Sequence, residues 1–198
     1  PRSTRAVTLF PCATRFRSVG GAAFRVVALS VAAVMACAGV VTGPLAPADP
    51  GNVTATVLRV VDGDTIDIRD DVRGRLRIRV LGIDTPETKK PGYTVGCWGP
   101  QATQFAEENL LGQRVAFVQD PTQDMTDRYG RTLAYLEKAD GWNYSVEAAR
   151  AGTARSYVYG DNPVSLYSQI FDAEQQARAM QRGLWGPPCF GETNSFPR

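Results

Sequence analysis

Residues 54–83 read TATVLRVVDGDTIDIRDDVRGRLRIRVLGI, and this stretch decides the fold. Its β-branched and apolar residues, which alternate with polar ones over much of the run, predict three strands, at 54–61, 65–69 and 76–83. Asp62-Gly63-Asp64 provides the first turn, because Asp-Gly between apolar runs is a strong hairpin signal. Residues 70–74 provide the second turn. The stretch therefore predicts consecutive strands joined by tight turns.

The rest of the chain adds two predicted strands and three predicted helices. Pro100 opens a helix that runs to Leu111 and ends at Gly112, since proline suits the first helical turn and glycine the residue after the last. We expect strands at 114–119 and 132–137, and further helices at 145–151 and 164–182. Five short strands with interspersed helices predict a small α+β barrel.

The first 48 residues have the composition of a targeting segment. They carry five arginines and no acidic residue, followed by the apolar run 26–41 and a small-residue stretch that ends at Ala48. The sixteen residues of that run are fewer than the ~20 that span a bilayer comfortably. This favours a cleavable signal peptide over a permanent N-terminal membrane anchor. A lipoprotein signal is a third interpretation, because residues 34–37 loosely match a lipobox. All three predict a secreted or cell-surface protein.

Removal of this leader would leave residues 49–198, a length that suits one domain with one core. We expect the folded domain to occupy residues 49–186. Residues 187–198 are rich in proline, glycine and polar side chains. They are predicted to form a loosely ordered tail, held only where Cys189 fixes it.

The charge of the chain depends on the leader. The full sequence has 22 basic and 20 acidic side chains and a net charge of +2. Without the five leader arginines, 17 basic side chains face 20 acidic ones, a net charge of −3. A nucleic-acid partner therefore cannot be argued from overall basicity, and any affinity for phosphate must come from a local arrangement of charges.

Two cysteines, Cys97 and Cys189, lie outside the leader. An even pair in an exported chain predicts a disulfide, which across this separation would stabilise the fold by roughly 4 kcal/mol on the chain-entropy model. Two free thiols are the alternative. A zinc site is excluded, because two cysteines without histidine cannot complete a zinc tetrahedron.

The chain contains no histidine. Imidazole is the usual general base near neutral pH and the commonest zinc ligand, so its absence excludes histidine-dependent catalytic triads and HExxH zinc sites. Acid–base chemistry would have to come from a carboxylate, a metal-bound water or a perturbed lysine. Metal binding would have to use carboxylates, carbonyl oxygens or cysteines.

Three polar clusters offer such groups: residues 62–65, then Arg79 with residues 84–87, then residues 127–131. Each alone has an ordinary structural explanation, as a hairpin turn, a strand end or helix start, and a bend with a solvated arginine. Together they supply oxygen ligands for a divalent cation and two guanidinium groups that suit a phosphate. Asp64 begins one predicted strand and Asp84 follows another. At the same edge of a small barrel they would repel each other unless a cation lay between them.

In sequence order, the clusters resemble the thermonuclease family, to which staphylococcal nuclease belongs. The similarity extends from about Val53 to Trp185 and is carried by six segments. These are Val-Asp-Gly-Asp-Thr at 61–65, Arg79 five residues before Asp84, Asp-Thr-Pro-Glu-Thr-Lys at 84–89, Gly-Pro-Gln-Ala at 99–102, Thr-Asp-Arg-Tyr-Gly-Arg-Thr-Leu-Ala-Tyr at 126–135, and Ser-Tyr-Val-Tyr at 156–159. The fold that the resemblance implies is an OB-type five-stranded β-barrel with three helices.

The resemblance also implies roles for individual residues. Asp64, Asp84 and the main-chain carbonyl of Thr85 would bind calcium (Ca²⁺). Glu87 would orient or deprotonate the attacking water, and Arg79 and Arg131 would contact the scissile phosphate. Three tyrosines match family positions that contact the nucleotide: Tyr129, Tyr157 and Tyr159. The implied activity is cleavage of DNA and RNA to products with 3′-phosphate ends.

We expect single-stranded nucleic acid to be the favoured substrate, because stacking on tyrosines needs exposed bases. Residues 93–98 and Arg128 depart from the lysines of the staphylococcal protein. The net negative charge of residues 49–198 predicts a weaker non-specific attraction to DNA. The competing hypothesis is a non-catalytic OB-type module that binds nucleic acid. A decayed site would have lost some of its five central residues, yet all five are present: Asp64, Arg79, Asp84, Glu87 and Arg131.

No obligate protein partner is inferred. Contact with a membrane is expected only if the leader is retained.

Overall fold

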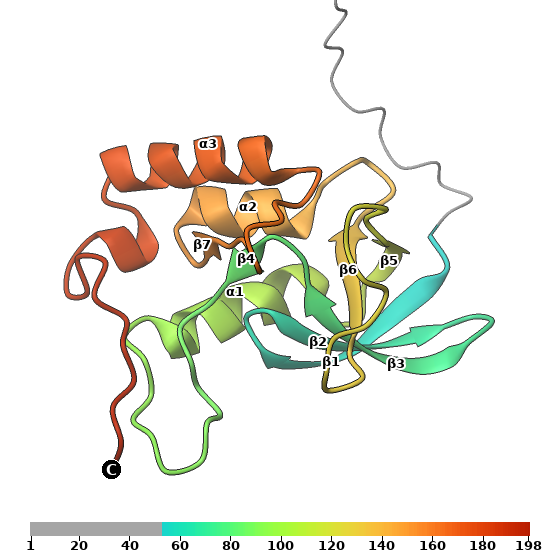
Figure 1. Cartoon of the computed structure of the whole chain (residues 1–198), viewed down its shortest axis with the longest axis horizontal. Coiled ribbons are helices and arrows are strands. Elements are labelled where there is room, and N and C mark those ends of the chain that lie inside the picture. The colour runs from blue at the N-terminus through green and yellow to red at the C-terminus, as the bar shows by residue number, and fades with distance from the viewer. Residues whose placement is uncertain (1–52) are drawn as a thin grey trace, which may run out of the picture. The chain divides into compact units, whose positions relative to one another are not determined.

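The computed structural model describes residues 53–198, so the predicted leader lies outside the described residues. Five strands close into a barrel in the order β1-β2-β3-β6-β5 (Figure 1). Their bounds are β1 Ala55–Asp62, β2 Thr65–Asp70, β3 Gly74–Val80, β5 Arg114–Val118 and β6 Thr132–Glu137. This confirms the predicted α+β fold with an OB-type five-stranded barrel and three helices.

The strand register brings two parts of the site together. The antiparallel pairing of β2 with β3 places Thr65 opposite Arg79. β3 also pairs with β6, in parallel, and Arg79 faces Leu133 there. Arg79 on β3 therefore lies between Thr65, the residue after Asp64, and the first residues of β6, which follow Arg131.

The predicted strand at 76–83 is interrupted. Gly82 adopts a φ of 75°, a conformation that favours glycine, and a Cβ there would lie 2.6 Å from Ile170 Cδ1 and 2.9 Å from Val164 Cγ2. The chain turns at this point and continues as β4, Ile83–Asp84, which pairs with β7, Arg155–Ser156, outside the barrel. The alternating sequence did not reveal this break, which carries Asp84 away from β3.

Three α-helices cover the barrel: α1 Gly99–Leu110, α2 Tyr144–Ala151 and α3 Tyr167–Ala179. Figure 1 shows α2 and α3 stacked on each other beside the barrel. Gly152, in a left-handed conformation, ends α2, as the sequence predicts. Strand residues such as Ile66 and Ile78 and helix residues such as Ile170 belong to one buried cluster, so barrel and helices share a hydrophobic core. No helix within residues 53–198 is long and apolar enough to cross a membrane.

The chain ends in a short 3-10 helix, η2 Gly183–Trp185, and the tail that follows it. The structure bonds Cys97 to Cys189, with the sulfur atoms 1.95 Å apart. The sequence predicts a loosely ordered tail, but its last residues pair with the loop before α1: Thr94 N donates to Phe196 O at 2.8 Å, and Arg198 N donates to Gly92 O at 2.8 Å. In Figure 1 the C-terminus lies beside this loop.

Candidate active site

Two carboxylates meet at one edge of the barrel. Asp64 follows the β1–β2 turn and Asp84 is the last residue of β4. Asp64 is buried, and its Oδ2 accepts hydrogen bonds from Thr85 N at 3.0 Å and Thr85 Oγ1 at 3.2 Å. These bonds attach the residue after Asp84 directly to Asp64. The structure thus places Asp64, Asp84 and Thr85 together.

Arg79 joins the two carboxylates. Its side chain is only 14% exposed, and its terminal nitrogens lie 3.4 Å from Asp64 Oδ2 and 3.1 Å from Asp84 Oδ1. Nη1 also donates to the carbonyl oxygens of Val80 and Ile83, at 3.0 and 2.9 Å. Backbone acceptors on both sides of the Gly82 turn therefore fix the guanidinium between the acids.

The single positive charge of Arg79 does not balance the negative charges of the carboxylates at this edge. Burial, with the charge of Asp64, raises the pKa of Asp62 to about 6. Partial desolvation and the same Asp64 charge also raise the pKa of Asp84, against the lowering effect of Arg79. Both shifts have the direction expected where carboxylates crowd together out of water.

The residues at this edge fit a hard divalent cation. The candidate donors are the carboxylates of Asp64 and Asp84 with the carbonyl oxygen of Thr85, all oxygen ligands of the kind that calcium prefers. Within residues 53–198 there is no group of three or more histidine, cysteine, aspartate or glutamate side chains placed to hold a metal ion. A cation here would therefore depend on backbone and water oxygens besides the two carboxylates.

Arg131 lies beside the acidic edge and is held by Asp127. Its Nε donates to Asp127 Oδ2 at 2.7 Å, and its Nη1 lies 3.3 Å from Thr65 Oγ1. Thr65 Oγ1 in turn donates to Asp64 Oδ1 at 3.1 Å. A continuous set of polar contacts thus connects the second arginine to the first carboxylate.

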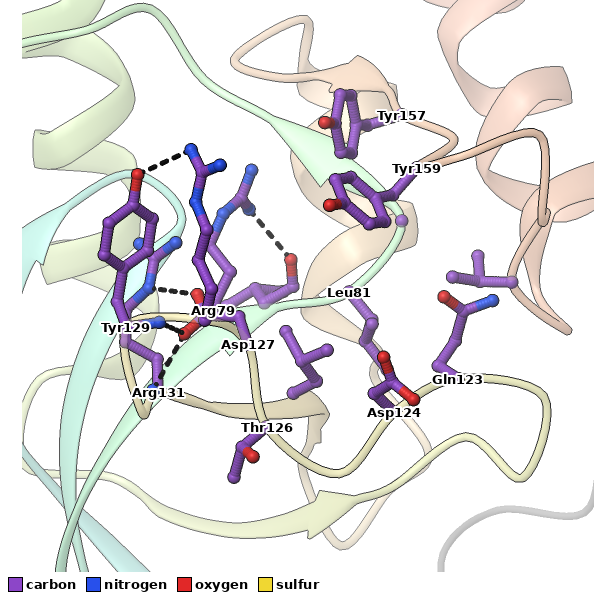
Figure 2. A pocket seen from close by; sticks show the side chains of 15 residues that line it. Arg79, Leu81, Gln123, Asp124, Thr126, Asp127, Tyr129, Arg131, Tyr157 and Tyr159 are labelled. Atoms are coloured by element: carbon purple, nitrogen blue, oxygen red, sulfur yellow. Dashed lines mark hydrogen bonds and ion pairs between the residues drawn. The ribbon is translucent and has the colours of Figure 1, made fainter.

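Both arginines line a hollow of about 430 Å³ together with the three predicted tyrosines. Figure 2 shows Tyr129 and Arg131 on one side of it and Tyr157 and Tyr159 on the other, with Arg79 between them. The exposed fractions are 68% for Tyr129, 41% for Tyr157 and 69% for Tyr159. The aromatic rings are therefore available for stacking on a base or packing on a sugar.

Glu87 lies apart from this hollow. It lines a second hollow of about 620 Å³ with Asp84, Thr85, Lys90 and Arg155. Glu87 Oε1 accepts hydrogen bonds from the backbone N–H groups of Lys89 and Lys90, at 2.7 and 3.0 Å. Asp84, paired with Arg79, stands where the two hollows approach each other.

The structure thus gathers most of the predicted site residues into two adjoining groups. Arg79, Arg131 and the three tyrosines share the first hollow, whereas Asp84, Thr85 and Glu87 share the second. The sequence places Asp127 in the third polar cluster without predicting that it holds Arg131, and it does not indicate Arg155 at all. The four-residue spacing of Asp127 and Arg131 within a glycine-containing turn could have indicated the first pair. Arg155 depends on the pairing of β7 with β4, which no local pattern reveals.

Comparison with known proteins shows the family. Residues 77–187 match the family described as "Staphylococcal nuclease homologue". The protein named "Thermonuclease" from Staphylococcus hyicus is 35% identical over 147 residues, which cover 73% of this chain and 84% of that protein. The "Thermonuclease" of Staphylococcus intermedius is 39% identical over 129 residues, covering 65% and 74%. An "Uncharacterized endonuclease" of Escherichia coli is 37% identical over 135 residues, covering 68% and 78%. The chain therefore belongs to the staphylococcal nuclease family.

Proposed function

We propose that this protein is a calcium-dependent nuclease that cleaves DNA and RNA to products with 3′-phosphate ends. The observation that carries the proposal is the placement of Arg79. It lies between Asp64 and Asp84 and lines the same hollow as Arg131 and three exposed tyrosines. The names of the related thermonucleases and of the endonuclease support the same activity.

The two arginines would act on the charge that develops at phosphorus. When water attacks the phosphate, a new P–O bond forms, the bond to the 5′ oxygen breaks, and negative charge collects on the equatorial oxygens. Planar guanidinium groups match that geometry and strengthen their hydrogen bonds as the charge grows. Loss of either Arg79 or Arg131 is expected to lower turnover on the order of 10³-fold, by analogy with arginines in other phosphoryl transfers.

Asp64, Asp84 and the Thr85 carbonyl would hold the cation. Calcium bound there would neutralise phosphate charge and polarise the phosphate oxygens. The Thr85 N–H fixes the Asp64 carboxylate in the direction of β4, so the donor set is organised by the fold itself. Preorganised ligands cost less reordering when the cation binds.

Glu87 would orient the attacking water or accept its proton. Two backbone N–H groups donate to one of its oxygens, Oε1. Because these backbone groups hold the carboxylate in place, we assign it chiefly the positioning of the water. The leaving 5′ oxygen takes its proton from solvent.

The substrate would be single-stranded or frayed nucleic acid. Stacking on the exposed ring of Tyr157 requires an unpaired base. The protein would act outside the cytoplasm, either secreted or at the cell surface. The Cys97–Cys189 disulfide supports this location, because disulfides persist in oxidising compartments.

An assay on single-stranded DNA tests the proposal. Activity is measured with Ca²⁺, Mg²⁺ or a chelator for the wild type, Glu87→Gln, Arg79→Ala and Arg131→Ala. We expect the wild type to be active with Ca²⁺ and inactive with the chelator. Every variant should lose activity, and the two arginine variants should lose it on the order of 10³-fold. Arg75→Ala is the matched control, since Arg75 lies on the same strand as Arg79 but is exposed and lines neither hollow.

Full activity in chelator would remove the calcium assignment. Wild-type rates in Glu87→Gln and Arg131→Ala would remove the proposed catalytic centre. End-group analysis of the products, by labelling with a kinase that needs a free 5′ hydroxyl, checks the direction of cleavage.

A further inference from the structure

The C-terminal tail forms part of the wall of the hollow that contains Glu87. Residues 191–195 line this hollow opposite Asp84 and Glu87. The match to the staphylococcal nuclease family ends at residue 187, so these residues lie beyond it. The tail, which lies outside the matched residues, thus lines the same hollow as Glu87 and Asp84.

Several backbone contacts join the tail to the loop that follows Glu87. Thr94 N donates to Phe196 O at 2.8 Å, and Phe196 N donates to Thr94 Oγ1 at 2.9 Å. Arg198 N donates to Gly92 O at 2.8 Å. The Cys97–Cys189 disulfide closes the other end of the same loop. The loop is thus fastened to the tail in its middle, at residues 92–94, and near its end, at Cys97.

Gly96 lies between the tail and Glu87. Its N–H donates to Glu87 O at 2.7 Å. A Cβ at Gly96 would lie 2.7 Å from Thr193 O, 3.1 Å from Pro86 Cβ and 3.2 Å from Glu87 N. The glycine is therefore packed between the tail on one side and the backbone of Glu87 on the other, with no room for a side chain.

Arg155 fastens the tail to the strand pair that carries Asp84. Arg155 lies opposite Asp84 in the β4–β7 pair. Its Nη2 donates to the carbonyl of Gly191 and, at 3.2 Å, to Thr193 Oγ1. The tail thus contacts the supports of both Asp84 and Glu87.

We propose that the tail is a positioning element for Glu87: fastened by the disulfide and by its pairing with residues 92–94, it holds the Glu87 backbone through Gly96. The inference rests on the proposed function. A carboxylate that orients water must be placed closely, since a displacement of about 1 Å can cost on the order of 10²-fold in rate. The residues that would bind the nucleotide line the other hollow, and no residue of the tail is among those that line it.

Two variants of the full chain release the tail in different ways. Cys97→Ser/Cys189→Ser removes the covalent bond. A chain that ends at Ser195 keeps the disulfide but loses the pairing with Gly92 and Thr94. Phe190→Ala is the control, because this side chain belongs to the same tail, is 64% exposed and lines neither hollow. All are assayed on single-stranded DNA with Ca²⁺, at a temperature where circular dichroism shows each to be folded.

We expect both tail variants to lower kcat on the order of tenfold or more, with KM changed by less than about twofold. In a Glu87→Gln background the same changes should lower kcat no further, because they act through Glu87. Phe190→Ala should match the wild type. If the serine variant does not fold, the shortened chain carries the test alone.

Two results would overturn the inference. One is an unchanged kcat in the shortened chain. The other is a further loss of kcat when the tail variants are made in the Glu87→Gln protein, so that the two effects multiply. Either can occur while Glu87→Gln itself is impaired, in which case the proposed function stands and only the role of the tail fails. A Glu87→Gln variant with wild-type activity would instead refute the proposed role of Glu87 in catalysis.

Discussion

At the scale of single residues, the site depends on charged groups that hold other charged groups in place. Asp127 accepts from Arg131 Nε at 2.7 Å, from Arg131 N at 3.0 Å and from Tyr129 N at 2.9 Å. Burial raises the pKa of Asp127, but the hydrogen bonds from Arg131 and Tyr129 outweigh it and keep that pKa below its usual value. Asp127 is therefore ionised at neutral pH and fixes both Arg131 and the turn that carries Tyr129.

Replacement of Asp127 by asparagine should weaken catalysis through Arg131. Asparagine keeps the shape but loses the charge that pairs with the guanidinium, so Arg131 would be held less firmly. We expect Asp127→Asn to lower kcat on the order of tenfold, and to have no further effect in an Arg131→Ala background. Steady-state kinetics on single-stranded DNA measures this. Asp172→Asn is the control, because Asp172 is an exposed acid of α3 that lines neither hollow. Independent, multiplying losses would show that Asp127 acts by another route.

At the scale of elements, local sequence patterns predicted the barrel strands but not where the chain leaves the barrel. The alternation of apolar residues in β1, β2 and β3 has a local cause, the two faces of a strand, and could be followed from sequence. The break at Gly82 has a tertiary cause, because Val164 and Ile170 from a distant segment occupy the space that a side chain would need. The two hollows and the docked tail arise from such long-range contacts, whereas the central residues of the candidate site are predicted from their motifs.

Asp120 joins three elements of the fold. It lies after β5, and its buried carboxylate accepts hydrogen bonds from Tyr135 of β6 at 2.7 Å and from Ser165, before α3, at 2.6 and 2.7 Å. The backbone N–H of Thr122 donates a further bond at 2.9 Å. Burial alone would raise the pKa of Asp120, but these hydrogen bonds outweigh it and hold that pKa well below its usual value.

Asp120→Asn should therefore destabilise the protein in a pH-dependent way. An amide NH₂ would face donors such as Tyr135 Oη or Ser165 N, at an expected cost of about 1–3 kcal/mol at pH 7. Because the folded-state pKa is depressed, the stability from Asp120 is present above the unfolded pKa of about 4 and is lost as pH falls through the folded pKa. Urea denaturation at several pH values should show the variant approaching the wild type in acid. Two results would contradict this: a difference in unfolding free energy between Asp120→Asn and the wild type that stays constant with pH, or an Asp120→Asn protein no less stable than the control Asp172→Asn.

At the scale of the whole molecule, charge is arranged locally and not in bulk. Residues 49–198 carry more acidic than basic side chains, yet three arginines line the hollow that contains the tyrosines: Arg79, Arg128 and Arg131. Arg128 also lies over the ring of Tyr129, 4.8 Å from its centroid. A nucleic acid would thus be held by a few phosphate contacts and by stacking, not by an extended basic surface.

The salt dependence of binding tests this arrangement. Two or three phosphate contacts predict a slope of about −1.4 to −2.1 for log K against log salt concentration on a single strand, at about −0.7 per contact. Fluorescence anisotropy with labelled single-stranded DNA, the Glu87→Gln protein and constant Ca²⁺ would measure the slope between about 50 and 200 mM salt. Arg131→Ala in that protein should make the slope shallower by about 0.7, because one phosphate contact is lost. Arg75→Ala should leave it unchanged, since Arg75 lines neither hollow. A slope steeper than about −4 would mean that many more cations contact the strand than the arginines of this hollow.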